Sequence, residues 1–457
     1  MKLLKLSTLL MTCASFVAAP LSSVHAESND TVDILTSVTG GKDEKDAEAF
    51  KTSLEKLTGL KLNIDKPADD YNSVLLQKLS NGGEGLDLIY FGQDQLNDLV
   101  QQGALLDISD YVANSEILSD SSVIPEEEWN NIKIDDKIYA GFNKKEIHRV
   151  VNTNQALMKK YDIATLKDET LEGYYNLFKE MKEKVNDIDG FYPYNAAISS
   201  LYDLQPWFAS QDIKTGIVLN DNGKRTAPIS NPEAKPVWEW LQKLYKEELM
   251  DPSALTDTTK ELREKFSSSQ TGLVVDWAAW TGLYNSNAGD DYPDTFEAVP
   301  SGGTKNSKGE YMLTRGGASL WGIPATSDNV EGAIKVLETF ATQEGGILLS
   351  LGSEGYDYNI KDGEYILTDI GESHGKDHGA PFPISEKFEA PLPQNPGVDE
   401  AMKLLEYAST ESFLPESPQY SEIVSQKAIE IIRGDVDVDT GLKDMHQSLL
   451  DAGVIEE

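Results

Sequence analysis

Residues 86–107 read LDLIYFGQDQLNDLVQQGALLD, and this stretch indicates the fold class of the chain. The first six residues form an apolar run with β-branched and aromatic side chains, which predicts a buried strand. Gly92 ends the run, Asp94 is a good helix N-cap, and apolar residues then recur at helical spacing as far as Gly103. A strand that passes through a tight turn into a helix is typical of α/β sheets.

The residues before this stretch repeat the same alternation. We predict a strand over 31–38, a helix that ends at Gly59, a strand over 60–64 and a helix over 70–79. Together with the strand over 86–91, these elements follow the order β-α-β-α-β. This order favours a mostly parallel sheet with helices on both faces.

Two residues at the end of the 86–91 strand are candidate ligand contacts. Open α/β sheets bind ligands outside the carboxyl ends of their strands, and Phe91 and Asp94 should stand at that end. The alternative for Phe91 is a position in the core, because phenylalanine is often fully buried.

The composition limits the classes of protein to which the chain can belong. Its 457 residues suggest two to three domains, and 39% hydrophobic residues are enough for a sizeable core. Acidic residues outnumber basic ones by 77 to 40, which gives a formal net charge of −37. Nucleic acid is therefore not expected as a partner, since phosphate groups are bound by clustered lysine and arginine. So large a net charge keeps a protein soluble and monomeric, so we expect a monomer.

The first residues have the pattern of an export signal. Lysines at positions 2 and 5 precede an apolar run over 6–19, and small residues then lead to Ala26. We expect residues 1–26 to be a signal peptide that is cleaved after Ala26, which would give an extracytoplasmic protein. The apolar run is too short for a transmembrane helix.

The single cysteine of the chain, Cys13, lies inside this signal. Cleavage after Ala26 would leave a mature protein without disulfide or thiol chemistry. The alternative makes Cys13 the lipid-modified residue of a bacterial lipoprotein. The residues before Cys13, Leu-Met-Thr, match that processing signal poorly, and the apolar run continues past it.

The second half of the chain holds clustered aromatic side chains. Residues 191–207 are rich in aromatics, a predicted buried strand over 272–275 is followed by two tryptophans, and residues 311–324 predict a strand with a glycine pair. Residues 382–396 are rich in proline and are expected to form an extended surface segment. The candidate ligand contacts in these segments are Tyr194, Trp207, Trp277, Trp280, Arg315 and Trp321.

No metal site or cofactor site is predicted. His374 and His378 are four residues apart, a spacing that converges on a metal only in a helix, whereas GESHGKDHGAP reads as a glycine-rich loop. Segments that begin at Asp187 and Asp435 resemble calcium loops, but their twelfth positions carry Ile and His instead of the bidentate Glu.

Most catalytic motifs are also missing from the sequence. It contains no Gly-x-Ser-x-Gly, no His-Glu-x-x-His and no phosphate-binding loop that ends in Gly-Lys-Ser/Thr. A pair of carboxylates for sugar hydrolysis stays open, because it needs only two well-placed acids among 77.

The order of several short motifs resembles that of a known family. The motifs are Phe50-x3-Leu54-x4-Gly59-Leu60-Lys61-Leu62, Gly85-Leu86-Asp87-Leu88 with Gly103-x-Leu105-Leu106-Asp107, Asp136-Lys137-Ile138-Tyr139-Ala140 with Val151-Asn152-Thr153, Gly272-Leu273-Val274-Val275-Asp276-Trp277-x2-Trp280, Ile323-Pro324, and Gly352-Ser353-Glu354-Gly355. With these, residues 30–455 resemble the extracellular solute-binding proteins of carbohydrate ABC importers, the group that includes maltose-binding protein. The last motif is similar to the members that bind longer oligosaccharides. The proline usual before Asp87 is absent, and no family calcium loop is recognisable.

This resemblance implies a type II periplasmic-binding-protein-like fold. Two α/β lobes would be joined by a hinge of several segments, with the ligand between them. The first lobe would comprise residues 30–143 and 288–345, and the second lobe residues 147–287 and 346–455, with the crossover near 143–147.

The resemblance also implies which residues contact the ligand. A pyranose has a C–H-rich face that stacks on aromatic rings, and its hydroxyls need fixed polar partners. By resemblance, Phe91, Trp277 and Trp280 would stack on the sugar, and Asp94 would accept a hydroxyl. Lys42 lies in a loop that would face the cleft, and Lys145 lies at the crossover, where maltose-binding protein has an acid.

The leading hypothesis is a non-enzymatic binding protein that captures a sugar or oligosaccharide outside the cytoplasm and delivers it to a membrane permease. Closure of the lobes would be a hinge motion, favoured by a ligand that touches both lobes. One alternative is a secreted glycosidase or polysaccharide lyase. Another is a binder of a different solute, such as a peptide or polyamine.

Overall fold

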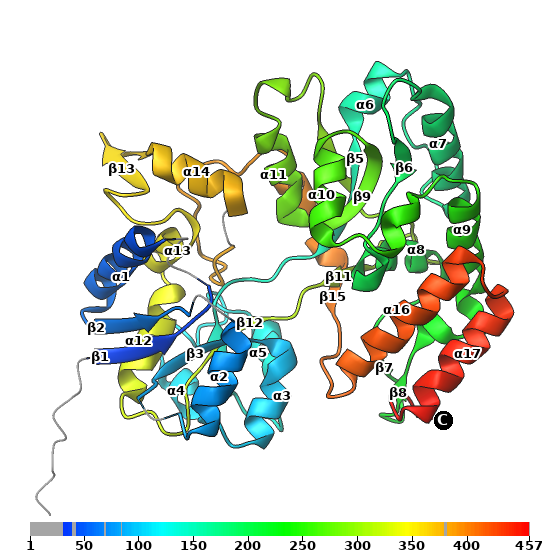
Figure 1. The fold of residues 1–457 in the computed structure, drawn as a ribbon. Helices are drawn as coiled ribbons and strands as arrows, with labels where there is room; N and C mark the ends of the chain where they lie inside the picture. Colours follow the sequence, from blue (N-terminus) through cyan, green and yellow to red (C-terminus); the bar gives the residue numbers. More distant parts are fainter. Residues whose placement is uncertain (1–30, 39–42, 68–69, 84, 379–381, 457) are drawn as a thin grey trace, which may run out of the picture.

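The computed structural model describes residues 31–38, 43–67, 70–83, 85–378 and 382–456. It has two α/β lobes side by side, connected by several strands of chain (Figure 1). The expected signal peptide with Cys13 and Ala26 lies outside the described residues, and so does Lys42.

The first lobe is built on a five-stranded sheet with the order β2-β1-β3-β12-β4. Its strands are β1 (Thr31–Leu35), β2 (Lys61–Asp65), β3 (Leu88–Gly92), β4 (Ala140–Phe142) and β12 (Ser319–Gly322). β1 pairs in parallel with both β2 and β3, which confirms the predicted parallel unit. β12 returns from late in the chain and lies antiparallel between β3 and β4.

Helices cover both faces of this sheet (Figure 1). They are α1 (Glu44–Thr58), α2 (Tyr71–Ser80), α3 (Gln93–Gln101), α4 (Ser109–Asn114), α5 (Glu126–Ile132), α12 (Val330–Phe340) and α13 (Gln343–Ser350). α1 ends at Gly59, as predicted, in the left-handed conformation that glycine adopts without strain. The predicted N-cap at Asp94 is wrong, because α3 begins directly after Gly92 and Asp94 lies in its first turn. An acid there still interacts favourably with the helix dipole.

The second lobe is built on a four-stranded sheet with the order β10-β5-β9-β6. Its strands are β5 (Arg149–Asn154), β6 (Tyr192–Tyr194), β9 (Thr271–Trp277) and β10 (Ala298–Ser301). The helices of this lobe are α6 (Gln155–Lys160), α7 (Leu171–Lys184), α8 (Gln205–Phe208), α9 (Lys235–Lys246), α10 (Thr259–Ser267), α11 (Ala278–Asn287), α15 (Val398–Met402), α16 (Ser417–Arg433) and α17 (Val438–Asp451). A small hairpin joins β7 (Val218–Leu219) to β8 (Arg225–Thr226).

The hinge contains a small parallel sheet in which β11 (Leu313–Arg315) pairs with β15 (Ala408–Thr410). The strand pairing moves two of the predicted lobe boundaries. β10 pairs with β5, so residues 298–301 belong to the second lobe, although the sequence put 288–345 in the first. The chain crosses back only at β11, after the second sheet has taken its last strand.

Residues that follow α13 also stay with the first lobe. Leu348 and Ile384 are buried in the first-lobe core, whereas the sequence put 346–455 in the second lobe. This segment contains the hairpin of β13 (Tyr358–Lys361) and β14 (Glu364–Leu367), then α14 (Asp369–His378). The apolar side chains around α13 pack on α1 and α12 and therefore keep the segment in the first lobe.

The predicted glycine loop around His374 is in fact helix α14. Thr368 begins this helix, since its hydroxyl accepts a hydrogen bond from the Gly371 N–H at 3.1 Å. Gly371 packs so closely on the Asp357 carbonyl that a Cβ atom would lie 2.0 Å from its oxygen. The glycine that argued against a helix is therefore required by the contact that holds the helix in place.

Within the described ranges, no helix is long and apolar enough to span a bilayer.

Candidate ligand-binding site

A cavity of about 730 Å³ lies between the two lobes. Five parts of the chain line it: the carboxyl ends of first-lobe strands, helix α1, the crossover between the lobes, the start of α11 in the second lobe, and residues from 348–375 and 382–395. α14 lies next to α11, so the segment attached to the first lobe reaches the second lobe beside the cavity (Figure 1).

The first-lobe sheet supplies one wall of the cavity. Ser37 and Val38 follow β1, and Tyr90 stands near the end of β3, at the sheet edge that the sequence predicts for ligand binding. The Tyr90 ring packs edge-on against Trp321 with a centroid distance of 5.5 Å. The Tyr71 hydroxyl donates a hydrogen bond to the Tyr90 carbonyl at 2.6 Å. Burial raises the pKa of the Tyr90 phenol, which therefore keeps its proton.

A hydrogen-bonded network on another wall fixes α14 to α1. His374 Nδ1 lies 2.7 Å from Asp357 Oδ1, and His374 Nε2 lies 3.3 Å from Asp46 Oδ2. The Tyr356 hydroxyl donates to Asp46 Oδ1 at 2.7 Å. Both carboxylates are buried and held in fixed positions, as polar partners for ligand hydroxyls must be.

Apolar side chains complete the lining. They include Phe50, Leu348, Phe382, Leu392 and two prolines of the 390–395 segment. The sequence predicted this proline-rich segment as a surface loop and did not assign it to the cleft. The alternation of prolines with Phe382 and Leu392 could have indicated that this segment packs against another part of the protein. An extended segment with apolar side chains buries them against a neighbouring surface.

Three lysines also line the cavity: Lys66, Lys144 and Lys145. Lys145 Nζ pairs with Glu386 Oε1 at 2.5 Å, whereas Lys144 Nζ is 3.9 Å from Glu146 Oε2, which is too far for a hydrogen bond. Partial burial lowers the pKa of the Lys66 ammonium, and the nearby Asp46 opposes that change.

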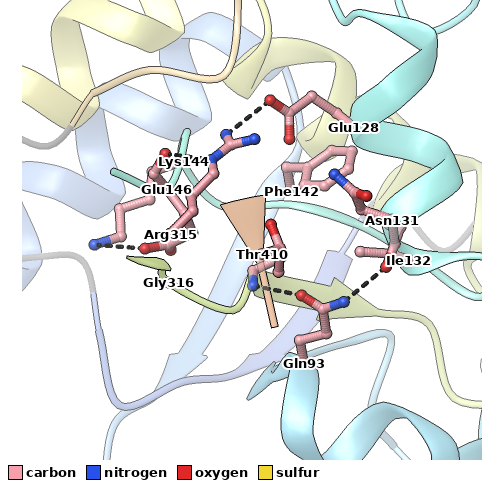
Figure 2. A pocket seen from close by; sticks show the side chains of 11 residues that line it. Gln93, Glu128, Asn131, Ile132, Phe142, Lys144, Glu146, Arg315, Gly316 and Thr410 are labelled. Atoms are coloured by element: carbon pink, nitrogen blue, oxygen red, sulfur yellow. Dashed lines mark hydrogen bonds and ion pairs between the residues drawn. The ribbon is translucent and has the colours of Figure 1, made fainter. Parts of the chain in front are cut away.

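A much smaller pocket lies at the hinge, and Figure 2 shows its side chains. It has a volume of about 10 Å³, which is roughly the space of one water molecule. Arg315 on β11 donates from Nη2 to Glu128 Oε1 on α5 at 2.7 Å, and from Nε to the Glu146 carbonyl at 3.0 Å. Arg315 thus fastens the hinge strand to the first lobe.

A family profile described as "Bacterial extracellular solute-binding protein" matches residues 38–347. The chain belongs to this family. As its members act outside the cytoplasm, this solute-binding protein is extracytoplasmic.

Similar proteins agree with this assignment. Lipoprotein LipO of Bacillus subtilis is 22% identical over 366 residues, which cover 75% of this chain and 70% of LipO. The alginate-binding protein AlgQ2 superposes with a TM-score of 0.66 at 19% identity, covering 92% of this chain and 94% of AlgQ2. The sugar-binding protein MalE of Xanthomonas citri superposes with a TM-score of 0.67 at 13% identity, covering 92% of this chain and 96% of MalE. The substrate-binding protein Lmo0181 of Listeria monocytogenes, in complex with cycloalternan, superposes with a TM-score of 0.65 at 16% identity. The superposition covers 93% of this chain and 99% of Lmo0181. These structures confirm the predicted type II fold.

Four aromatic residues that the sequence assigned to the cleft of this solute-binding protein are instead buried in the lobe cores. They are Phe91, Tyr194, Trp207 and Trp321. Phe91 faces the first-lobe core because successive side chains of β3 alternate, and its neighbour Tyr90 lines the cavity. Trp321 lies on β12 in the interior of the sheet and donates from Nε1 to Asn143 at 3.0 Å.

Tyr194 and Trp207, in the second lobe, are also buried with their polar groups hydrogen-bonded inside the core. Trp207 donates from Nε1 to the Tyr194 hydroxyl at 2.9 Å, and the two rings meet edge-on. Each ring therefore satisfies the polar group of the other inside the core, as buried tyrosine and tryptophan require.

The remaining predicted residues lie near the cavity or at the hinge. Lys145 lines the cavity, Arg315 belongs to the hinge pocket, and Asp94 is exposed outside the described lining. Trp277 and Trp280 are half-buried and flank Ala279, which lines the cavity at the start of α11.

A cation lies against each of these two tryptophan rings. The Arg149 guanidinium is 4.9 Å from the centre of the Trp277 ring, and the Arg263 guanidinium is 3.7 Å from that of Trp280. These contacts hold both rings in place. Among the described residues, no group of three or more His, Cys, Asp or Glu side chains is arranged to hold a metal ion.

Proposed function

We propose that this solute-binding protein captures a sugar or oligosaccharide in the cavity between its lobes and delivers it to the permease of an ABC importer. The observation that carries the proposal is the cavity itself. Its volume of about 730 Å³ lies within the usual range for small-molecule sites. It combines apolar and aromatic surface from Phe50, Tyr90 and Phe382 with the fixed polar groups of the His374 network.

The similar structures support a carbohydrate ligand. AlgQ2 is an alginate-binding protein, Lmo0181 is in complex with cycloalternan, a solute-binding protein of Thermotoga lettingae is bound with α-D-tagatose, and MalE is a sugar-binding protein. In the proposed cycle the ligand first rests against the first-lobe wall, and closure brings Trp277 at the end of β9 and Trp280 on α11 onto it. A ligand that contacts both lobes shifts the population toward the closed form, in which both lobes can dock on a permease.

A thermal-shift screen against mono-, di- and oligosaccharides, with peptides and polyamines included for comparison, tests the proposal. A bound sugar stabilises the folded state in proportion to the logarithm of its concentration. Saturable stabilisation by at least one sugar, with the sugar recovered intact, is the expected result. Accumulation of cleaved products would instead support the glycosidase or lyase alternative, and stabilisation only by peptides or polyamines would support a non-sugar solute.

We also propose that the protein is exported by cleavage after Ala26 and functions as a monomer. The similarity to a lipoprotein keeps attachment of a lipid at Cys13 as the alternative. The intact mass of the mature protein separates the two, because processing at Cys13 retains residues 13–26 and adds acyl chains. Light scattering gives the oligomeric state.

A further inference from the structure

The charge of the cavity wall differs from that of the rest of the chain. Acidic residues outnumber basic ones by 77 to 40 in the whole sequence. Among the described residues that line the cavity, the fully charged side chains are three lysines and two aspartates, and neither glutamate nor arginine occurs. The balance between the two signs is therefore reversed at the ligand site.

The two aspartates already accept hydrogen bonds within the protein. Asp357 accepts from the Ser353 N–H at 2.7 Å and contacts His374. Asp46 accepts from the Asp43 N–H at 3.2 Å and from the Tyr356 hydroxyl, and it also faces His374. Both carboxylates are buried and hydrogen-bonded within the protein, whereas Lys144 and Lys145 pair with Glu146 and Glu386, which are not among the described residues that line the cavity.

Two of the lysines are consecutive and stand at the hinge. Lys144 and Lys145 lie on the crossover between β4 and β5, and the Lys145 N–H donates to the Phe382 carbonyl at 2.7 Å. The partner of Lys145, Glu386, has a side chain that is 42% exposed, and Lys144 is only loosely paired with Glu146. Solvent weakens such pairs, so an anionic group of a ligand can replace these partners.

We propose that the ligand is an acidic sugar whose anionic group binds to Lys144 and Lys145. This inference rests on the proposed function and narrows its substrate class to a sugar that carries a carboxylate, sulfate or phosphate. A neutral sugar would leave two ammonium groups in the cavity without a ligand partner. An acidic sugar gives each of them a charge-assisted hydrogen bond.

The test compares matched sugars on the full mature chain by calorimetric titration. The panel contains oligogalacturonate, oligomannuronate and oligoglucuronate, the carboxyl-reduced neutral form of each, and sulfated and phosphorylated disaccharides. We expect at least one acidic sugar to bind at least tenfold more tightly than its neutral counterpart. The sulfated and phosphorylated arms then show whether the anion must be a carboxylate.

Variants assign the effect to the two lysines. Lys144→Gln and Lys145→Gln should each weaken binding of the acidic sugar at least fivefold and reduce its preference over the neutral form. Lys78→Gln is the matched control, because Lys78 on α2 pairs with Asp65 at the end of β2 and is not among the residues that line the cavity. Unfolding midpoints verify that each variant is folded.

The outcomes distinguish failure of the acidic-sugar proposal from failure of the proposed function. Equal or tighter binding of neutral sugars, or lysine variants that bind the acidic sugar normally, would overturn this inference and leave the proposed function intact. Failure of every sugar in the panel and in the wider screen would overturn both.

Discussion

The two lobes support their cavity-facing ends in different ways. In the first lobe, Tyr90 rests on neutral groups: the Trp321 ring, whose N–H bonds to Asn143, and the Tyr71 hydroxyl. In the second lobe, Trp277 and Trp280 rest on arginines that are paired with buried aspartates, Arg149 with Asp203 and Arg263 with Asp276. The first wall therefore depends on packing and neutral hydrogen bonds, whereas the second depends on buried charge.

The largest effect is expected at the buried pair of the second lobe. Asp203 is fully buried and pairs with Arg149 beneath Trp277, so Asp203→Asn leaves the arginine charge uncompensated. Breaking such a pair should lower the free energy of unfolding by about 3 kcal/mol. In the first lobe, Asn143→Ala removes only the acceptor of the Trp321 N–H and should cost about 1 kcal/mol. Urea unfolding measures both; equal losses would contradict the difference between the lobes.

The next effect depends on pH and lies beside the hinge strand β15. Burial raises the pKa of Glu411 from 4.5 to about 7, although Thr215 and Lys214 act in the opposite direction. The folded state therefore keeps a proton that the unfolded chain releases. This group's stabilisation is complete below about pH 4.5, falls as pH rises to 7, and stays lost above it.

Glu411→Gln should remove this penalty. We expect the variant to be more stable than the parent by about 2 kcal/mol at pH 8, with little difference at pH 4. Thermal unfolding across this range measures the change, and Glu406→Gln, two residues before β15, is the control. A difference that does not depend on pH would show that the pKa of Glu411 is not raised in the folded protein.

The tryptophans at the junction of β9 and α11 should affect binding more than stability. Trp277→Ala and Trp280→Ala each remove a stacking surface and should weaken sugar binding by about 1–2 kcal/mol. Tyr111→Ala is the control, since Tyr111 is an exposed aromatic residue on α4 outside the described lining. Unchanged affinity in both tryptophan variants would mean that the second lobe contacts the ligand through other groups.

The smallest expected effect concerns the His374 network of the first-lobe side. His374→Asn removes the bonds to Asp46 and Asp357 and should cost about 1 kcal/mol. Amide hydrogen exchange in α14 should become faster, while exchange in β5 stays unchanged. Ser373→Ala, an exposed change on the same helix, is the control. Slow exchange in α14 of the histidine variant would show that apolar contacts alone hold this helix.

The comparison also explains which parts of the molecule the sequence could predict. The parallel unit β1-β2-β3 follows from local periodicity and glycine breaks, so its strands and the sheet edge that faces the cavity were predicted. The sequence could not predict that Tyr90, and not Phe91, lines the cavity. Both faces of a central strand are apolar, and only the packing of helices decides which face of the strand is open to the cavity.

Long-range contacts account for the other failures. α14 contains glycines that disfavour a helix, and contacts with Asp357 and Asp46 override that preference. The segment of residues 390–395 lines the cavity through contacts between regions far apart in the sequence. Tryptophan by itself gave no distinction between core and cleft, since Trp207 and Trp321 are buried while Trp277 and Trp280 are half-buried.

The most direct test of the central claim is a distance measurement between the lobes with and without sugar. Spin labels can be attached at Lys56→Cys on α1 and Lys260→Cys on α10, two exposed positions, in a chain that lacks Cys13. The account predicts that the sugar selected by the screen shortens the interlobe distance and saturates at the same concentration as binding. Saturated binding with an unchanged distance distribution would contradict closure of the two lobes around the ligand.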